Sequence, residues 1–216
     1  MSYWVLKQLL LGPLLRLLGR PKVEGLQHIP RTGPVIIAAN HLAAIDSLYL
    51  ALVLPRRITF IAKQEYFTQP GPRGRIIRWV MTATGQVAVD RSGGSASTAA
   101  LDAAVRILES GGAWGIHPEG TRSPDGRVYR GRTGAIRVAM RTGAPLVPVA
   151  LSGTDRINPR GRRFWRPGRV HIVFGHARTF PPLDHTEVRT ATDTLMTDLA
   201  TRSGRRYVDR YAAKFR

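Results

Sequence analysis

Residues 35–46 read VIIAANHLAAID, an apolar run of five residues followed at once by a polar stretch with a histidine and an aspartate. The run Val35–Ala39 predicts a buried strand, and the residues from Asn40 onward predict a loop at its carboxyl end. Ligands of α/β proteins bind at that end of the sheet. His41 and Asp46 are therefore the first candidates for a functional site.

Outside this stretch, short apolar runs alternate with amphipathic stretches. Further strands are predicted at residues 58–62, 87–89, 113–116, 146–150 and 170–174. Helices are predicted at residues 46–54, 74–83, 95–110, 133–141 and 187–202. Strands that alternate with helices favour an α/β fold, which we expect to hold a mixed, mostly parallel sheet with helices on both faces. The sequence has no repeat and no long linker, so residues 21–216 are predicted to form one domain.

Basic residues dominate the charge of the 216-residue chain. It has 33 Lys and Arg against 14 Asp and Glu, a formal net charge of +19, and 29 of the 33 basic residues are arginine. Arginine binds phosphate with two parallel hydrogen bonds, so this balance favours an anionic membrane, a nucleic acid or a phosphorylated metabolite as partner. The chain has no cysteine, which excludes disulfides, zinc–thiolate sites, iron–sulfur clusters and a thiol nucleophile.

Residues 1–20 are rich in leucine, but two basic residues and a Gly-Pro pair interrupt the apolar run. This pattern fits neither a signal peptide nor a spanning helix. We expect an amphipathic segment that lies in a membrane interface, with contacts from Trp4, Lys7 and Arg16. The alternative is a terminal helix that packs on the core through its leucines.

A second basic segment, residues 155–169 (DRINPRGRRFWRPGR), holds six arginines around two aromatic side chains. We expect Arg163, Phe164 and Trp165 to contact a lipid headgroup layer. The same composition suits a single nucleic-acid strand that stacks its bases on the aromatic rings, or a solvated hairpin loop.

His41 and Asp46 are five residues apart, about 140° around a helix axis, so they would not share a helical face. If His41 lies in the loop and Asp46 in the first turn of the next helix, the carboxylate can reach the imidazole. Such a pair orients a histidine that acts as a general base. The alternatives are a capping aspartate and an ordinary loop histidine.

A second cluster, HPEGTRS at residues 117–123, also follows a predicted strand. Arg122 can bind a phosphate through its guanidinium group and Thr121 can donate a hydrogen bond to it, while Gly120 leaves room for close approach. Glu119 adds a carboxylate, and Arg91 ends a third segment, GQVAVDR, after the strand predicted at 87–89. Because all three clusters follow strands, we expect them to form one site.

Several reaction classes lack their motif here. The sequence has no G-x-S-x-G nucleophile elbow and no P-loop. A divalent metal could be held by His41, Asp46, His117 and Glu119, but base, orienting group and phosphate ligands explain these residues, so no metal site is predicted. What remains is direct attack of a substrate hydroxyl, deprotonated by His41, on an activated acyl donor.

Four segments in order, NHLAAID (40–46), GQVAVDR (85–91), HPEGTRS (117–123) and VPV (147–149), resemble the motifs of the glycerolipid acyltransferases, the family of bacterial lysophosphatidic acid acyltransferases. The resemblance covers about residues 22–175. It implies that His41 is the base and that Asp46 orients it. It further assigns the acceptor phosphate to Arg91, Glu119, Gly120 and Arg122, and acyl-substrate binding to Pro148.

The resemblance implies transfer of a fatty acyl group from an acyl-coenzyme A or acyl carrier protein thioester to lysophosphatidic acid, giving phosphatidic acid. It implies no cofactor, a peripheral or monotopic location on the cytoplasmic face of the cell membrane, and an anionic membrane rather than nucleic acid as partner. Other acceptors remain open: glycerol-3-phosphate, a lysophospholipid or a glycolipid. A basic nucleic-acid-binding protein and a metal-dependent phosphoesterase are alternatives from other classes.

Four positions depart from the family pattern. Ala43 replaces the usual serine of the first motif, Ala88 the usual aromatic residue of the second, and His117 the usual phenylalanine of the third. After the third motif, Arg130 or Arg132 takes the place of the common lysine. For His117 we expect a packing role like that of the aromatic ring it replaces. The residues assigned to the chemistry are all present.

Overall fold

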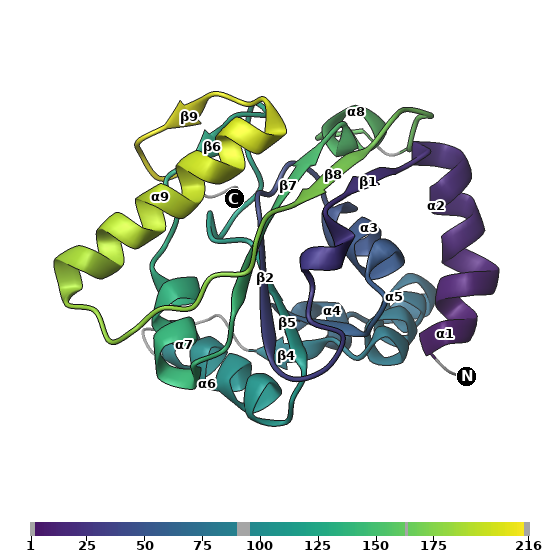
Figure 1. Cartoon of the computed structure of the whole chain (residues 1–216). Coiled ribbons are helices and arrows are strands. Elements are labelled where there is room, and N and C mark those ends of the chain that lie inside the picture. Colours follow the sequence, from purple (N-terminus) through teal and green to yellow (C-terminus); the bar gives the residue numbers. More distant parts are fainter. Residues whose placement is uncertain (1–2, 90–95, 163, 214–216) are drawn as a thin grey trace.

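A seven-stranded sheet runs through the middle of the molecule (Figure 1). The computed structural model describes residues 3–89, 96–162 and 164–213. In spatial order the strands are β1 (Lys22–Glu24), β8 (His171–Phe174), β7 (Leu146–Ser152), β2 (Val35–Ala39), β5 (Ala113–Ile116), β3 (Ile58–Lys63) and β4 (Val87–Val89). Neighbouring strands are parallel except β7 and β8, which are antiparallel. The predicted mixed, mostly parallel sheet is thus confirmed.

The central strand β2 is buried on both sides, and its side chains alternate between two hydrophobic cores. Val35, Ile37 and Ala39 point into the first core, while Ile36 and Ala38 point into the second. The first core is covered by α2 (Gly12–Gly19), α3 (Asp46–Val53) and α8 (Thr154–Ile157). The second core is covered by α6 (Ala96–Glu109), α7 (Gly134–Thr142) and α9 (His185–Ser203). Helices therefore lie on both faces, as predicted (Figure 1).

The N-terminal segment forms one continuous helix made of α1 (Tyr3–Val5), the π-helical turn η1 (Leu6–Leu11) and α2. The Gly-Pro pair does not end it: Gly12 and Pro13 are the first two residues of α2, directly after the π-helical turn. Leu15 is 1% exposed and belongs to the first core. The carbonyls of Leu18 and Gly19 accept hydrogen bonds from the backbone of Gly168 and Val170. This helix is therefore packed on the body of the protein.

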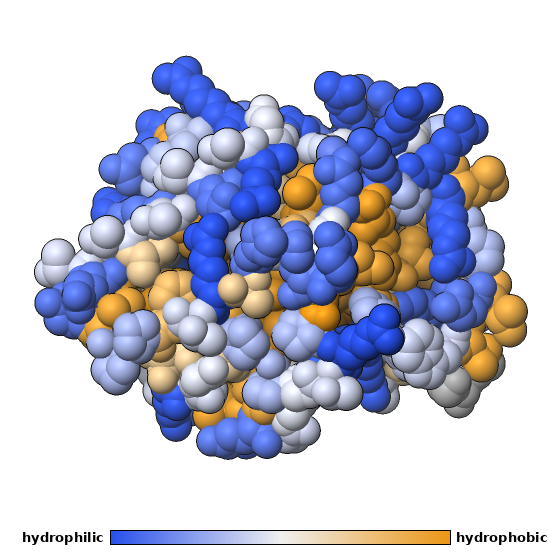
Figure 2. Space-filling view, in the orientation of Figure 1, coloured by the Kyte–Doolittle hydropathy of each residue, from blue (hydrophilic) through white to orange (hydrophobic). Residues whose placement is uncertain are grey.

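The outer side of the N-terminal helix is apolar. Its large exposed side chains are Trp4, Leu9, Leu14 and Leu17, between 46% and 73% exposed. Figure 2 shows hydrophobic residues along the right edge of the molecule, over α1 and α2, among hydrophilic neighbours. Among the described residues, no helix combines the length and the apolar character needed to cross a bilayer.

Lys7 is not exposed, as the predicted contact with a membrane would require. Its side chain is buried, and its ammonium group donates a hydrogen bond to the carbonyl of Leu54. Burial, with a smaller contribution from Arg16, lowers the pKa of Lys7 to about 8. Lys7 is the second residue of the π-helical turn η1.

The remaining elements lie around the sheet. They are the 3-10 turn η2 (Leu26–His28), the helices α4 (Glu65–Thr68) and α5 (Gly71–Thr84), and the strand pair β6 (Val128–Tyr129) and β9 (Tyr207–Val208). The helix predicted at 74–83 corresponds to α5, which is longer because it begins on a Gly-Pro pair that fits a first turn. The helix predicted from residue 95 is α6, and Ser95 itself lies outside the described residues.

Candidate active site

The site begins where β2 ends. Asn40 is fully buried, and its amide bonds both backbone groups of Leu151 in β7: Nδ2 donates to the carbonyl at 3.0 Å and Oδ1 accepts from the N–H at 2.7 Å. The side chain of Asn40 thus adds two hydrogen bonds between the end of β2 and the neighbouring strand β7. It fixes the direction in which the chain leaves β2, and so the position of His41.

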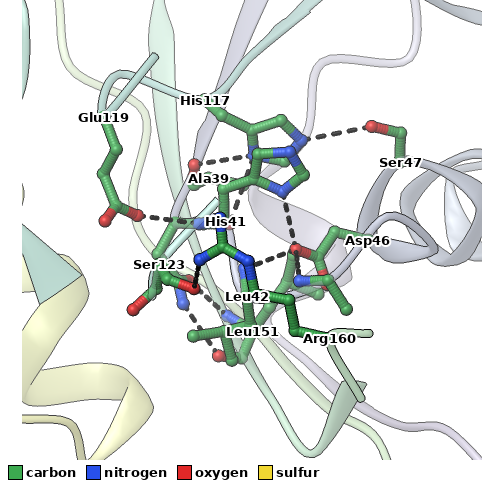
Figure 3. A network of polar contacts seen from close by, with 12 residues as sticks. Ala39, His41, Leu42, Asp46, Ser47, His117, Glu119, Ser123, Leu151 and Arg160 are labelled. Atoms are coloured by element: carbon green, nitrogen blue, oxygen red, sulfur yellow. Dashed lines mark hydrogen bonds and ion pairs between the residues drawn. The ribbon is translucent and has the colours of Figure 1, made fainter. Parts of the chain in front are cut away.

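His41 and Asp46 are in contact, as the sequence predicted. Nδ1 of His41 lies 2.8 Å from Oδ2 of Asp46, the first residue of α3 (Figure 3). The same oxygen accepts hydrogen bonds from the backbone N–H groups of Leu42 at 2.6 Å and Ala43 at 2.8 Å. Because the carboxylate can only accept, Nδ1 of His41 carries the proton and Nε2 carries the lone pair.

Asp46 is completely buried, and burial by itself would raise its pKa. The hydrogen bond and the charge of His41, together with smaller contributions from His117 and Thr154, outweigh that effect and hold the pKa below its ordinary value. The carboxylate therefore stays ionised at neutral pH. An ionised aspartate on Nδ1 makes the opposite nitrogen a stronger base and stabilises the imidazolium that forms when it takes a proton.

His117 lies flat against His41. The two ring centroids are 3.9 Å apart and the rings are 7° from parallel, as Figure 3 shows. Nδ1 of His117 is 3.0 Å from the carbonyl oxygen of Ala39, so it is the protonated nitrogen, and Nε2 accepts from the Ser47 hydroxyl at 3.1 Å. Burial and the neighbouring His41 lower the pKa of His117 to about 3, so the ring stays neutral. Phe60 of β3 stacks nearby, with its centroid 5.7 Å from His117.

Glu119 holds the backbone of His41. Its carboxylate is buried, accepting from the N–H of His41 at 2.8 Å through Oε1 and from the N–H of Tyr129 in β6 at 3.0 Å through Oε2. The carbonyl of His41 in turn accepts from the N–H of Ser123 at 2.7 Å. Both backbone polar groups of His41 are therefore bonded by the segment 117–123, so the first and third motifs form one site.

These contacts give Glu119 a structural role. Its two oxygens bond backbone N–H groups and hold the backbone of His41 in place, whereas its contact with the acceptor phosphate stays a prediction. Burial raises its pKa to about 7, opposed by the hydrogen bonds from His41 and Tyr129. The local sequence pattern does not indicate this role, because one of the two N–H groups belongs to His41, which lies 78 positions away in the chain.

The next three residues of the third motif, Gly120, Thr121 and Arg122, are more exposed than Glu119. Gly120 is exposed and has a φ of +73°, a left-handed conformation that favours glycine, and a side chain there would meet Arg132 at 3.1 Å. Thr121 and Arg122 are half-buried. Arg160, in the basic loop after β7, donates a hydrogen bond to the carbonyl of Ser123 at 3.5 Å. The positive charge of Arg122 contributes, after burial, to lowering the pKa of Arg160.

Arg160 belongs to the loop in which Arg163, Phe164 and Trp165 are predicted to contact lipid. Its own side chain reaches the third motif, a contact that the sequence analysis did not anticipate. No local signal distinguishes it from the other five arginines of the loop. Arg130, by contrast, is paired with Asp193 and Asp209 at 3.7 and 3.4 Å.

The remaining predicted residues are Arg91 of the second motif and four proposed membrane contacts. Arg91 and Arg163 lie outside the described residues, although β4, which precedes Arg91, ends at Val89. Phe164 and Trp165 are 77% and 37% exposed, and Arg16 is exposed on α2.

Pro148 is buried within β7, where Gly175 approaches its ring. These contacts are those of a packed sheet residue, and its link to acyl binding stays a prediction. In the described part of the chain, no group of three or more His, Asp or Glu side chains has a spacing that could hold a metal ion.

Comparison with known proteins identifies the family of the chain. The chain matches the Acyltransferase family model over residues 20–152, which contain all four motifs. It is 35% identical over 153 residues to the chloroplastic 1-acyl-sn-glycerol-3-phosphate acyltransferase LPAT1 of Arabidopsis thaliana, covering 70% of this chain and 41% of that protein. It is 31% identical over 133 residues to the 1-acyl-sn-glycerol-3-phosphate acyltransferase of Borreliella burgdorferi, covering 62% of this chain and 51% of that protein.

The chain thus spans about half the length of these curated relatives. Among solved structures it resembles the crystal structure of the 1-acyl-sn-glycerophosphate acyltransferase PlsC from Thermotoga maritima. The TM-score is 0.70 at 28% sequence identity, with 89% of this chain and 76% of that chain covered. The family model covers more than half of the sequence and the resemblance to glycerolipid acyltransferases is confirmed, so the chain belongs to the acyltransferase family.

Proposed function

We propose that this protein transfers a fatty acyl group from a thioester to the free hydroxyl of lysophosphatidic acid, giving phosphatidic acid. The observation that carries the proposal is the contact between His41 and Asp46. The third motif supports it, because Glu119 and Ser123 bond the backbone N–H and carbonyl of His41. The names of the relatives, 1-acyl-sn-glycerol-3-phosphate acyltransferases, support the acceptor.

In the proposed mechanism, His41 is the general base. Its Nε2 takes the proton of the acceptor hydroxyl as the oxygen attacks the thioester carbonyl. The tetrahedral intermediate then collapses, the carbon–sulfur bond breaks, and the thiolate takes the proton from the imidazolium. Asp46 stabilises the imidazolium between these two steps, and no covalent acyl-enzyme is needed.

The acceptor phosphate is proposed to bind to Arg122, Thr121 and Gly120, together with Arg91 of the second motif. Arg160 adds a second guanidinium beside Arg122, and two neighbouring positive charges favour a dianion between them. Holding the phosphate fixes the distance between the hydroxyl and His41, and orientation of this kind can account for several powers of ten in rate.

The acyl donor is proposed to be a coenzyme A or acyl carrier protein thioester, with Pro148 near the acyl substrate. The enzyme is proposed to act at an anionic membrane, on its cytoplasmic face. The exposed side chains of the N-terminal helix, Trp4, Leu14 and Leu17, support this location, with Arg16 beside them. The loop 155–169 adjoins this helix, because the N–H of Gly168 donates to the carbonyl of Leu18. Phe164 and Trp165 are exposed in this loop, and Arg163 belongs to it.

Release of thiol from oleoyl-coenzyme A, followed with a thiol reagent, tests the proposal directly because the chain has no cysteine of its own. We expect release only with acceptor present, and we expect lysophosphatidic acid to surpass glycerol-3-phosphate and lysophosphatidylcholine. His41→Ala should lower turnover by at least about 10³-fold. His185→Ala, which removes an exposed histidine at the start of α9, is the matched control. Turnover retained in His41→Ala, or no release with lysophosphatidic acid, would contradict the proposal.

A further inference from the structure

Helix α5 lies outside both hydrophobic cores. None of its described side chains belongs to either cluster, and only Gly74 and Thr84 are buried along its 14 residues. A helix of this length is marginally stable alone in water. Its stability in this protein therefore depends on contacts other than the core.

One face of α5 is apolar and exposed. Pro72, Ile76 and Trp79 follow one another at intervals of four and three residues, so they lie on the same side of the helix. Ile76 is 63% exposed and Trp79 is 42% exposed. Together with Arg75 they line a hollow of about 330 Å³ on the surface.

Arginines flank this face. At about 100° per residue, Arg73 and Arg75 project to opposite sides of the direction shared by Ile76 and Trp79. Both are exposed, as is Arg78 further around the helix. An apolar stripe that contains a tryptophan and has basic residues along its edges is the pattern of helices that lie in the headgroup region of anionic membranes.

The C-terminal end of α5 adjoins the N-terminal helix. Arg57 connects them, since its Nε donates to the carbonyl of Thr84 at 3.3 Å and its guanidinium lies 5.7 Å from the ring centroid of Tyr3. Figure 1 shows α5 and α1 on the same side of the molecule, away from α9. The end of α5 therefore adjoins the start of the helix that carries a second exposed apolar face.

We propose that the Ile76–Trp79 face of α5 inserts into the interface of an anionic lipid membrane, as a second membrane contact beside the N-terminal helix. This inference rests on the proposed function, which locates the acceptor in a membrane. An acidic protein could pair with the arginines, but it is a poorer match for an exposed isoleucine and tryptophan between them. The net charge of +19 adds long-range attraction to anionic lipid.

Single cysteines report on this contact, because the natural chain has none. Ile76→Cys is labelled with a polarity-sensitive dye and mixed with vesicles of phosphatidylglycerol and phosphatidylcholine. We expect a blue-shifted, brighter emission. Thr197→Cys, exposed on α9, is the control that should stay unchanged, and Leu14→Cys reports on the N-terminal helix. Arg75→Gln should weaken binding to anionic vesicles about fivefold, from roughly 1 kcal/mol per basic residue, without affecting neutral ones.

The outcomes separate this inference from the proposed function. A response at Leu14→Cys with none at Ile76→Cys would overturn the role of α5 and leave membrane binding intact. A response at Ile76→Cys without lipid that grows with protein concentration would identify a second copy as the occupant. A response to acyl carrier protein alone would identify an acidic protein. Thiol release with lysophosphatidic acid in detergent, measured on the same labelled proteins, tests the proposed activity independently.

Discussion

One oxygen atom, Oδ2 of Asp46, organises the first motif. It accepts the N–H of the His41 ring and two backbone N–H groups, so a single carboxylate both orients the base and shapes the loop that carries it. The charge of this group matters beyond its shape, since the proposed mechanism forms an imidazolium beside it.

We predict that Asp46→Asn lowers kcat by about 10³-fold or more, because the amide can keep the backbone contacts but cannot stabilise the imidazolium. KM for the acceptor should change little. Steady-state kinetics of the folded variant checks this, with Asp102→Asn, which affects an exposed ion pair with Arg141, as control. A raised KM with unchanged kcat would instead assign Asp46 to substrate binding.

His117 couples stability to pH. Its pKa is about 3 in the folded protein against 6.5 in the unfolded chain, so the unfolded state binds more protons between these values. The free energy of unfolding must therefore fall as pH decreases below 6.5, by about 1.4 kcal/mol per pH unit from this residue.

We predict that His117→Phe removes this slope. The variant should be less stable than the natural protein at pH 7.5, since Ser47 loses a partner, but the difference should narrow by about 2 kcal/mol at pH 5. Urea unfolding at both pH values measures it. Parallel pH profiles for the two proteins would mean that folding does not lower the pKa of His117.

At the level of elements, β3 and β5 support the site through close packing. A side chain on Gly115 in β5 would meet the ring of Phe60 in β3 at 2.3 Å, and that ring stacks near His117, which contacts His41. Strand β5 therefore needs its glycine to let the ring of Phe60 lie beside His117, which stacks on His41.

We predict that Gly115→Ala destabilises the protein by about 1–3 kcal/mol and lowers turnover, because Phe60 must move. Adding Phe60→Leu should recover part of the stability by making space. Unfolding and kinetics of both single variants and the double variant form a thermodynamic cycle. Additive effects would show that the two positions are not coupled.

Across the whole molecule, the N-terminal helix divides its leucines between the core and the surface. Leu15 is 1% exposed in the first core, whereas its neighbours Leu14 and Leu17 are 50% and 73% exposed. The two expectations for this segment, packing on the core and contact with a membrane, therefore concern different faces of one helix.

We predict that Leu15→Ala destabilises the protein by about 2–5 kcal/mol. Leu17→Ser should change the free energy of unfolding by less than about 0.5 kcal/mol but weaken binding to phosphatidylglycerol vesicles. Urea unfolding and vesicle flotation measure the two effects. Equal vesicle binding by Leu17→Ser and the natural protein would show that this face does not contact lipid.

Six of the seven strands of the main sheet, most of the helices that cover them and the contact between His41 and Asp46 could be predicted, because they depend on short stretches of chain. The three-residue strand β1 and the four-residue helix α8 are too short to give such a pattern. Alternation of apolar side chains follows from local geometry, and a loop of five residues lets an aspartate at a helix start reach the preceding histidine. The four motifs lie within the segment that the family model matches.

What the sequence determined by itself was thus the order of most elements and the first-motif pair. Only the tertiary structure decided that Glu119 bonds the backbone of His41, that Arg160 reaches Ser123 and that Lys7 is buried against Leu54. Each of these contacts joins residues at least 37 positions apart. Such contacts depend on how strands are ordered in the sheet and how helices are rotated on it, and local patterns contain no record of either.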